Sequence, residues 1–442
     1  MRLLLVGAFP YPHHQGSQVY FQEQAIALRA AGAEVCLLTY DAEPSAPPEP
    51  NLPRKRIRGR RAAEHWRALD GFEHRTSPKW SSPTRLRSGP NWAKPLGDLG
   101  LAMTLRNAVA SHQGDDAYDA ILTHNAEAAL VALHALPKSR PPILYCVHTL
   151  LENELSAYLR SPNELESQGF LNSIGVFSAT GASARALDRM GRGIDRWIAK
   201  RVDGWISLTQ SSERVMRQFS RVPGGILPPP IPDPERSSEA LDPVEVAARY
   251  ALEPGRYFIY SGNLDGYQEL DTLAAAAVVL AARSDTPPPI VVASHGGAGE
   301  ESPQGGGGGG WDEAMPGVEF RALESAAEMQ ALLSAARASL VMRRAKGGFP
   351  IKLANSLSVG TPIIAFHEQE WGLTHEQNSL ICPSDRPGQR LADAIERLAT
   401  DAALSERLAA GARDLYLERH RPEQIASETL ALVEKVRSDG AR

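Results

Sequence analysis

The chain has 442 residues, of which 43% are hydrophobic and 22% are charged, and its formal net charge is −5. This composition is typical of a soluble globular protein, and the length predicts two or three domains. No apolar run approaches the roughly 18 residues that a membrane-spanning helix requires. Residues 1–7 form an apolar run too short for a signal peptide, so we expect a cytoplasmic protein that begins with a β-strand.

The three cysteines, Cys36, Cys146 and Cys382, are far apart and lie in or beside apolar, strand-like runs. This spacing favours buried thiols in a reducing compartment. We therefore expect neither a disulfide framework nor a structural metal site.

The first half of the chain alternates between apolar runs and helical stretches. Residues 2–6 predict a strand, a helix follows and stops at Gly32, and residues 34–39 predict a second strand. Such a strand–helix–strand unit starts a parallel, doubly wound sheet. An irregular basic stretch at 41–100 interrupts the pattern. Further strands are predicted at residues 119–124, 143–148 and 204–209, the last of which closes the sheet.

A Pro- and Gly-rich stretch at 223–232 separates the two halves, because it fits neither a helix nor a central strand. The alternating pattern then restarts and ends in helices over 387–438. We therefore predict an α/β protein with two Rossmann-like, doubly wound parallel sheets. The strands of the second sheet are predicted at residues 256–260, 290–294, 338–342 and 362–366.

Residues 338–366 are the most informative stretch of the sequence. Between a predicted strand and the next helix lie three cations and two glycines, within residues 343–348. Free N–H groups and the dipole at such a helix N-terminus bind anions. A phosphate that carries a hydroxylated sugar suits this site best. Three polar residues share one face of the helix, namely Lys352, Asn355 and Ser356.

Two histidines, His124 and His148, each end a predicted parallel strand. In open α/β sheets the ligand crevice lies at the carboxyl ends of the strands. A neutral imidazole there can bind a sugar hydroxyl or stabilise a developing charge, although each histidine can instead cap its strand structurally. The loop at 7–17 lacks the G-x-G-x-x-G pattern of a dinucleotide site.

Residues 51–95 hold twelve Lys/Arg and three Asp/Glu, a local balance of +9. Trp66, Trp80 and Trp92 lie among these cations. A solvated loop, a nucleic-acid site and an anionic membrane surface are all compatible with this pattern. The sequence contains no zinc-ligand spacing, P-loop, nucleophile elbow or H-E-x-x-H motif.

Together these features resemble a known family, the retaining glycosyltransferases of the GT-B fold (the family-4-like group, also called glycosyl transferases group 1). The resemblance covers nearly the whole chain, and its combination of motifs is more specific than any one of them. The matching stretches are Gly16-Ser17 before the first helix, Gly262-Asn263-Leu264 with Gln268-Glu269-Leu270-Asp271, Gly348-Phe349-Pro350 up to Gly360-Thr361-Pro362, and Gly372-Leu373 with the run from Asn378 to Pro383.

The resemblance implies two domains that face each other across a cleft. Residues 1–226 would bind the acceptor and contain the insertion at 41–100, whereas residues 227–415 would bind the nucleotide sugar. Residues 416–442 would form a helix that packs back on the first domain. The implied reaction is metal-independent hexosyl transfer with retention at the anomeric carbon, in the synthesis of cell-envelope glycans, polysaccharides or glycolipids. No cofactor is expected, because the nucleotide sugar is a substrate.

The resemblance also assigns site residues. His148 stands where the family has a histidine close to the reacting sugar, and His124 would be the second catalytic candidate. The donor-binding residues would be Gly16, Asn263, Gln268, Arg343, Lys346, Gly347, Gly348, Phe349, Pro350, Ile351, Lys352 and Asn355.

Two departures from the family pattern concern this donor site. Gly347 and Asn355 stand in place of two glutamates, and Asn263 and Gln268 replace the arginine and lysine that usually bind the diphosphate. Asn355 can still hydrogen-bond a ribose hydroxyl, but without a charge. We expect the missing positive charge to come from residues beside the donor helix, namely Lys346, Lys352, Arg343 or Arg344.

The expected partners are a nucleotide sugar, a glycan or lipid-linked acceptor, and an anionic membrane surface contacted through residues 54–94. No nucleic acid is expected. Two other activities stay open. A nucleotide-sugar epimerase of the same fold would turn over its ligand without an acceptor, and a binding protein with a decayed donor site would bind without turnover.

Overall fold

The structure is a computed structural model that divides the chain into two compact units. The first unit comprises Met1–Pro230, Lys346–Phe349 and Pro422–Arg442, and the second comprises Ile231–Ala345 and Pro350–Arg421. The roles expected for the two domains stay predictions. The structure describes residues 1–12, 16–41, 71–82, 94–154, 181–234, 240–262, 269–294, 317–344, 348–366 and 370–440.

The first unit contains a seven-stranded sheet with the order β3-β2-β1-β4-β5-β6-β7. Every neighbouring pair of strands is parallel. The run Leu3–Val6 in β1 is wholly buried, because helices cover this sheet on both faces. The strands are β1 (Arg2–Pro10), β2 (Glu34–Tyr40), β3 (Glu73–Thr76), β4 (Ala120–His124), β5 (Ile143–Val147), β6 (Gly204–Ser207) and β7 (Gly224–Ile226).

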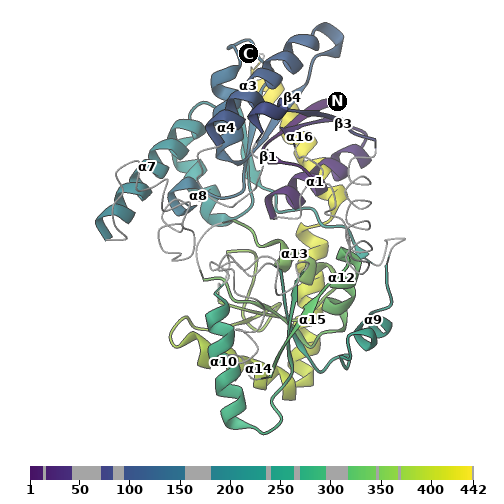
Figure 1. Cartoon of the computed structure of the whole chain (residues 1–442). Coiled ribbons are helices and arrows are strands. Elements are labelled where there is room, and N and C mark those ends of the chain that lie inside the picture. The colour runs from purple at the N-terminus through teal and green to yellow at the C-terminus, as the bar shows by residue number, and fades with distance from the viewer. Residues whose placement is uncertain are drawn as a thin grey trace. The chain divides into compact units, whose positions relative to one another are not determined.

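Helices cover both faces of this first sheet (Figure 1). On one face, α3, α4, α7 and α8 form a single apolar core with the strands. On the other face, α1 packs against the C-terminal helix α16. The helices are α1 (Gly16–Ala30), α3 (Lys94–Ser111), α4 (Asn125–Ala135), α7 (Gly181–Ala199), α8 (Gln210–Phe219) and α16 (Pro422–Gly440), with the short 3₁₀ helices η1 (Lys79–Ser81) and η2 (Gly114–Asp116).

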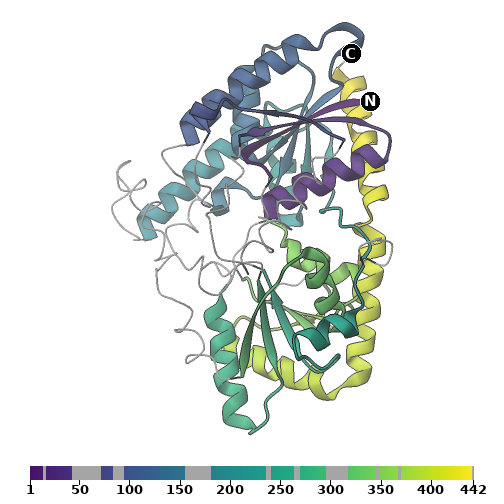
Figure 2. The same ribbon diagram turned by 45° about the vertical axis from the view of Figure 1, so that its right-hand side comes forward.

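The second unit contains a six-stranded parallel sheet with the order β10-β9-β8-β11-β12-β13. Helices α10 and α14 pack side by side on one face, and α9 and α12 cover the other (Figure 2). The elements are β8 (Phe258–Ser261), β9 (Ile290–Ser294), β10 (Val318–Ala322), β11 (Ala338–Val341), β12 (Ile363–Ala365), β13 (Leu380–Ile381), α9 (Pro243–Arg249), α10 (Leu270–Arg283), α12 (Ala326–Ala335), α13 (Ile351–Ser358), α14 (Pro387–Thr400) and α15 (Ala402–Arg419).

The first sheet does not end at the strand expected over 204–209, so that expectation is wrong. Strand β7 pairs in parallel with β6 and forms the edge of the sheet. A Cβ atom at Gly224 would overlap the indole ring of Trp205, so only glycine fits beside that ring. The Pro- and Gly-rich stretch is thus excluded from the centre of the sheet but not from its edge.

The two parallel, doubly wound sheets confirm the predicted α/β fold class. The three cysteines are free and buried, as expected. In the part of the chain that the structure describes, no helix is both long enough and apolar enough to cross a bilayer.

Candidate functional site

Two histidine side chains meet at the carboxyl edge of the first sheet. Strand β4 ends at His124 and pairs in parallel with β5, with His124 opposite Cys146. His148 follows the last residue of β5, so the rings come from neighbouring strand ends. His124 Nδ1 lies 2.9 Å from His148 Nε2, within hydrogen-bonding distance. Both side chains are buried. The sequence placed both histidines at this edge but did not predict the bond between them.

Helix α1 provides an aromatic wall for this histidine pair. The Tyr20 ring centroid lies 4.8 Å from that of His148 and 5.3 Å from that of His124, and the Phe21 ring lies 4.9 Å from His124. Gln24 is one turn further along the helix and donates an amide N–H to the Tyr20 hydroxyl at 3.1 Å. Neither Tyr20 nor Gln24 was predicted from the sequence. Their i, i+4 spacing, just after the first loop, could have indicated that both lie on one face of a helix beside the site.

Burial keeps both imidazoles neutral. It lowers the pKa of His148 to about 3, although the negative charge of Glu127 acts in the opposite direction. Burial, together with repulsion from His148, lowers the pKa of His124 well below its ordinary value. One ring therefore donates a hydrogen bond to the other. Because Nε2 of His148 is used in this bond, its Nδ1 is the ring nitrogen left for a substrate.

The chain is strained where it leaves β4. Asn125 has a φ of +75°, in the left-handed region that side chains other than glycine rarely adopt. Asparagine tolerates this conformation better than most residues, and such strain concentrates at functional sites. Among the described residues, none hydrogen-bonds the buried Nε2 of the neighbouring His124. The strained residue Asn125 and the buried Nε2 of His124 thus both lie at the end of β4, where the sequence predicted a functional site.

An ion pair lies in the first turn after His124. Glu127 of α4 is hydrogen-bonded to the ammonium of Lys94, the first residue of α3. Burial would raise the pKa of Glu127, but the adjacent ammonium holds it below its ordinary value. Glu127 therefore keeps its charge and supplies the negative field that acts on His148.

In the second unit, α13 follows β11 as the sequence predicted. Pro350 is the N-cap residue, and Gly360, with a φ of +68°, ends the helical segment. Ser356 does not share a ligand face with Lys352: it is fully buried, and its hydroxyl is hydrogen-bonded to that of Ser339 on β11 at 2.8 Å. Ser356 therefore fixes the helix on the sheet. The Asn355 side chain is partly exposed.

The Lys352 ammonium lies at the carboxyl end of β8. Its Nζ atom is 3.9 Å from the centroid of the buried Tyr260 ring, a cation–π contact. A Cβ atom at Gly262 would lie 3.3 Å from the same nitrogen. Gly262 has a φ of +130° and directly follows the last residue of β8. The structure thus places the Lys352 ammonium beside Gly262, the residue before the stretch in which Asn263 and Gln268 replace the family's arginine and lysine.

The charge of Arg344 is compensated by a carboxylate. Its Nε atom and its backbone N–H both donate to Glu269 Oε2, at 2.7 and 3.2 Å. Glu269 is itself held in the left-handed conformation, with a φ of +57°, as the residue that precedes α10. Arg343 is partly buried at the end of β11. Arg344 therefore has little net charge to offer a phosphate.

The remaining predicted donor residues are distributed between the two units. Gly16 is the first residue of α1 in the first unit and is exposed. Phe349 is buried, and the stretch Lys346–Phe349 belongs to the first unit, whereas Ile351 starts α13 in the second. Four predicted residues lie outside the described part of the chain, namely Asn263, Gln268, Lys346 and Gly347.

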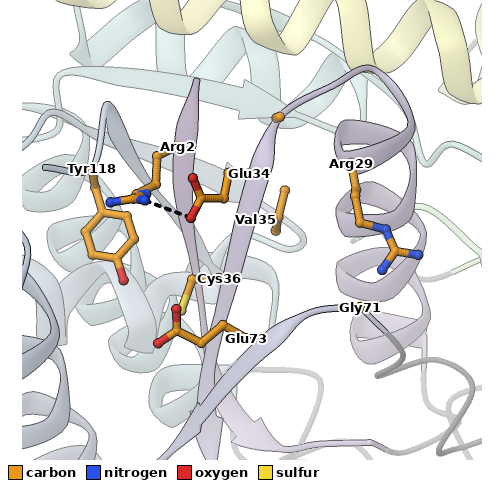
Figure 3. A pocket seen from close by; sticks show the side chains of 9 residues that line it. Arg2, Arg29, Glu34, Val35, Cys36, Gly71, Glu73 and Tyr118 are labelled. Carbon is orange, nitrogen blue, oxygen red and sulfur yellow. Dashed lines mark ion pairs between the residues drawn. The ribbon is translucent and has the colours of Figure 1, made fainter. Parts of the chain in front are cut away.

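A cavity of about 360 Å³ lies at the opposite edge of the first sheet (Figure 3). Its lining includes Arg2 and Glu34 at the amino ends of β1 and β2, which form an ion pair at 2.9 Å. Burial raises the pKa of the Cys36 thiol in its wall to about 11, so the thiol is unreactive. Ligands of doubly wound sheets bind at the carboxyl ends of the strands, so we assign no substrate to this cavity.

Two family models match the chain. The model described as Glycosyl transferase 4-like domain matches residues 15–226, and the one described as Glycosyl transferase-like matches residues 274–431. No curated protein matches the chain in sequence at a significant level.

Solved structures share the fold over nearly the full length of the chain at low identity. Sucrose-phosphate synthase from Thermosynechococcus elongatus is 17% identical with a TM-score of 0.70, and the match covers 99% of each chain. HepE of Anabaena, solved in complex with UDP, is 14% identical with a TM-score of 0.64, over 98% of this chain and 100% of that one. WaaG, a glycosyltransferase involved in lipopolysaccharide biosynthesis, is 13% identical with a TM-score of 0.59, over 97% and 99%.

Proposed function

We propose that this chain, which belongs to the family-4-like, group 1 glycosyltransferases, moves a sugar from a nucleotide-sugar donor to an acceptor hydroxyl with retention at the anomeric carbon. The bond from the anomeric carbon to the donor phosphate breaks, and a bond from that carbon to the acceptor oxygen forms. The acceptor proton leaves with the diphosphate. HepE, which shares the fold, has also been solved with UDP-glucose, and this supports a nucleotide sugar as the donor class.

The single observation that carries this proposal is the position of the Lys352 ammonium beside the turn at Gly262. A leaving diphosphate needs positive charge, and the sequence lacks the two cations usual for this turn. Lys352 replaces part of that charge from α13, and the positive end of the dipole of this helix adds to it. We propose that this arrangement works without a metal. Full activity in the presence of a chelator is the expected result, and loss of activity that Mg²⁺ restores would contradict it.

The histidine pair contributes a neutral hydrogen-bonding group. A side chain with a pKa of about 3 is a poor general base near neutral pH. We therefore propose that His148 Nδ1 hydrogen-bonds a hydroxyl of the transferred sugar, while His124 fixes its ring orientation. The donor phosphate, as the departing group, takes the acceptor proton.

Turnover of UDP-glucose and of matched GDP-, ADP- and TDP-sugars tests this function. We expect nucleotide release that depends on an added glycan or glycolipid acceptor. The rate of this release should be lower in Lys352→Gln. Interconversion of two nucleotide sugars without any acceptor would identify an epimerase instead. Binding of a nucleotide sugar without turnover, over a panel of acceptors, would identify a decayed donor site.

We further propose that the first unit docks on an anionic lipid bilayer. Three exposed apolar residues lie on one face of α3 at helical spacing, namely Leu96, Leu99 and Met103, and they are 46%, 54% and 47% exposed. Trp80 of η1, which packs on α3, is 58% exposed. Arg106 lies one turn after Met103, and the sequence over 51–95 carries a balance of +9. Exposed apolar side chains, in a domain whose sequence has a strongly basic segment, suit the headgroup region of an acidic membrane.

Vesicle sedimentation tests this surface. We expect the protein to bind vesicles of phosphatidylcholine with phosphatidylglycerol, and to bind pure phosphatidylcholine weakly. Leu99→Gln with Met103→Gln should remove binding, whereas the control Val278→Gln, at a residue of α10 that is 52% exposed, should leave it unchanged. Equal binding to both vesicle types would refute the charge argument. A stable dimer in solution that the double variant dissociates would assign the patch to self-association.

A further inference from the structure

A buried carboxylate on α7 holds the backbone just after His148. Asp195 is fully buried, and its two carboxylate oxygens accept the backbone N–H groups of Leu151 and Glu152 at 3.2 and 3.0 Å. Residues 151–154 form one helical turn, in which the N–H groups of Asn153 and Glu154 donate to the Leu150 carbonyl. The first N–H groups of such a turn have no partner within it. Asp195 thus caps this turn from a helix some forty residues further along the chain.

Two more contacts join α7 to the same turn. Gly191 lies one helical turn before Asp195, and a Cβ atom there would lie 2.6 Å from the Glu152 nitrogen and from the Leu151 carbonyl carbon and oxygen. Only glycine allows this close approach. Arg192 and Glu152 form an ion pair at 2.7 Å. The carboxylate cap, the missing Cβ and the ion pair all act on the segment that starts three residues after His148.

This capping arrangement carries an energetic cost. Burial is the main reason that the pKa of Asp195 is raised to about 6, even though the two backbone N–H groups act to lower it. Burial therefore makes the charged carboxylate costly relative to its own protonated form. Aspartate nevertheless fixes two N–H groups at once, whereas asparagine offers only one acceptor oxygen.

We propose that Asp195 is a positioning residue that fixes the turn after β5, and through it the His148 imidazole on His124. The inference rests on the proposed role of His148 at the reacting sugar. Small displacements of a group that contacts the reacting centre reduce turnover strongly, without a comparable effect on ground-state binding. The carboxylate therefore acts on catalysis through the geometry of His148.

The matched test compares Asp195→Asn with Asp203→Asn. Asp203 also accepts a backbone N–H of β5, that of Ile143 at 2.8 Å, but at the amino end of the strand, away from His148. Hydrogen exchange at one of the two amides, Leu151 or Glu152, should rise roughly tenfold in Asp195→Asn, as loss of one such bond implies, and both should stay unchanged in Asp203→Asn. The ¹⁵N resonances of His148 should shift in Asp195→Asn alone. The melting temperature of Asp195→Asn should fall modestly, because one buried N–H group loses its acceptor.

Kinetics separate positioning from simple support. We expect Asp195→Asn to lower kcat about tenfold or more with little change in KM, and Asp203→Asn to leave kcat unchanged. Unchanged amide exchange, unchanged His148 resonances, or a kcat equal to that of the wild type would each overturn the inference. If the wild type transfers no sugar, the proposed function fails, yet exchange and ¹⁵N resonances still decide whether Asp195 holds His148.

Discussion

Replacing His148 with asparagine tests whether the histidine pair is buried in its neutral form. At about pH 7.5 the variant loses the hydrogen bond to His124 and the ring contact with Tyr20. It also leaves a buried ring nitrogen of His124 without its partner. We expect the variant to be less stable than the wild type by about 1–3 kcal/mol under these conditions.

This stability difference should shrink as the pH falls. In the unfolded chain His148 titrates near 6.5, whereas burial lowers its pKa in the folded protein to about 3. Below pH 6.5 the unfolded state therefore binds more protons than the folded state, and stability falls with pH. Between about pH 6.5 and about pH 4.5, protonation of His148 in the unfolded state should lower the free energy of unfolding of the wild type by roughly 2–3 kcal/mol. The variant lacks this histidine and therefore lacks this contribution.

Urea unfolding of both proteins over this pH range measures the effect. His134→Asn, which removes an exposed histidine near the end of α4, is the control. It measures how the free energy of unfolding changes when a histidine outside the pair is removed. We expect the difference between wild type and His148→Asn to close almost completely at the acidic end. A difference that stays constant with pH would refute a buried, neutral His148.

Three further predictions concern the second unit. Lys352→Gln should weaken the binding of a nucleoside diphosphate, measured by calorimetry, by roughly 10-fold or more. Lys138→Gln, in the first unit, is the control and should leave the affinity unchanged. An unchanged affinity in Lys352→Gln would exclude Lys352 from the site. Asn355→Glu restores the family's carboxylate and should tighten donor binding about fivefold; weaker binding would contradict its place beside the ribose. Arg413→Gln loses bonds to Asp233 and to the Ser358 carbonyl, so unfolding free energy should fall by about 1–3 kcal/mol with donor affinity unchanged.

The elements that the sequence predicted well are short, wholly apolar runs between turn residues. The run Leu3–Val6 is an example: a parallel strand buried on both faces needs no alternation of polar and apolar residues. Strand β3, with the sequence Glu-His-Arg-Thr, was missed because it forms a polar edge. Strand β7 was missed because it begins with two glycines, residues that usually break strands, and the first of them, Gly224, is required there by the ring of Trp205.

From the sequence, the candidate site could be predicted only as a set of positions at the ends of strands and in the loops that follow them. The carboxyl ends of β4 and β5 identified both histidines, and the cation-rich stretch identified Lys352. The direct bond between the imidazoles, the contact of Lys352 with Tyr260 and the cap from Asp195 depend on tertiary packing. Asp195 lies among the cations of an amphipathic helix, a pattern that normally indicates a solvated face.

Thermal unfolding in the presence of UDP-, GDP-, ADP- and TDP-sugars measures whether the second unit binds a nucleotide sugar. A ligand that binds only the folded state raises its stability by about 2.7 kcal/mol at a hundredfold excess over its dissociation constant. We predict that one nucleotide class raises the melting temperature of the wild type, and does so less for Asn355→Ala. No shift with any of these sugars, for a protein that unfolds cooperatively, would show that the second unit is not a nucleotide-sugar site.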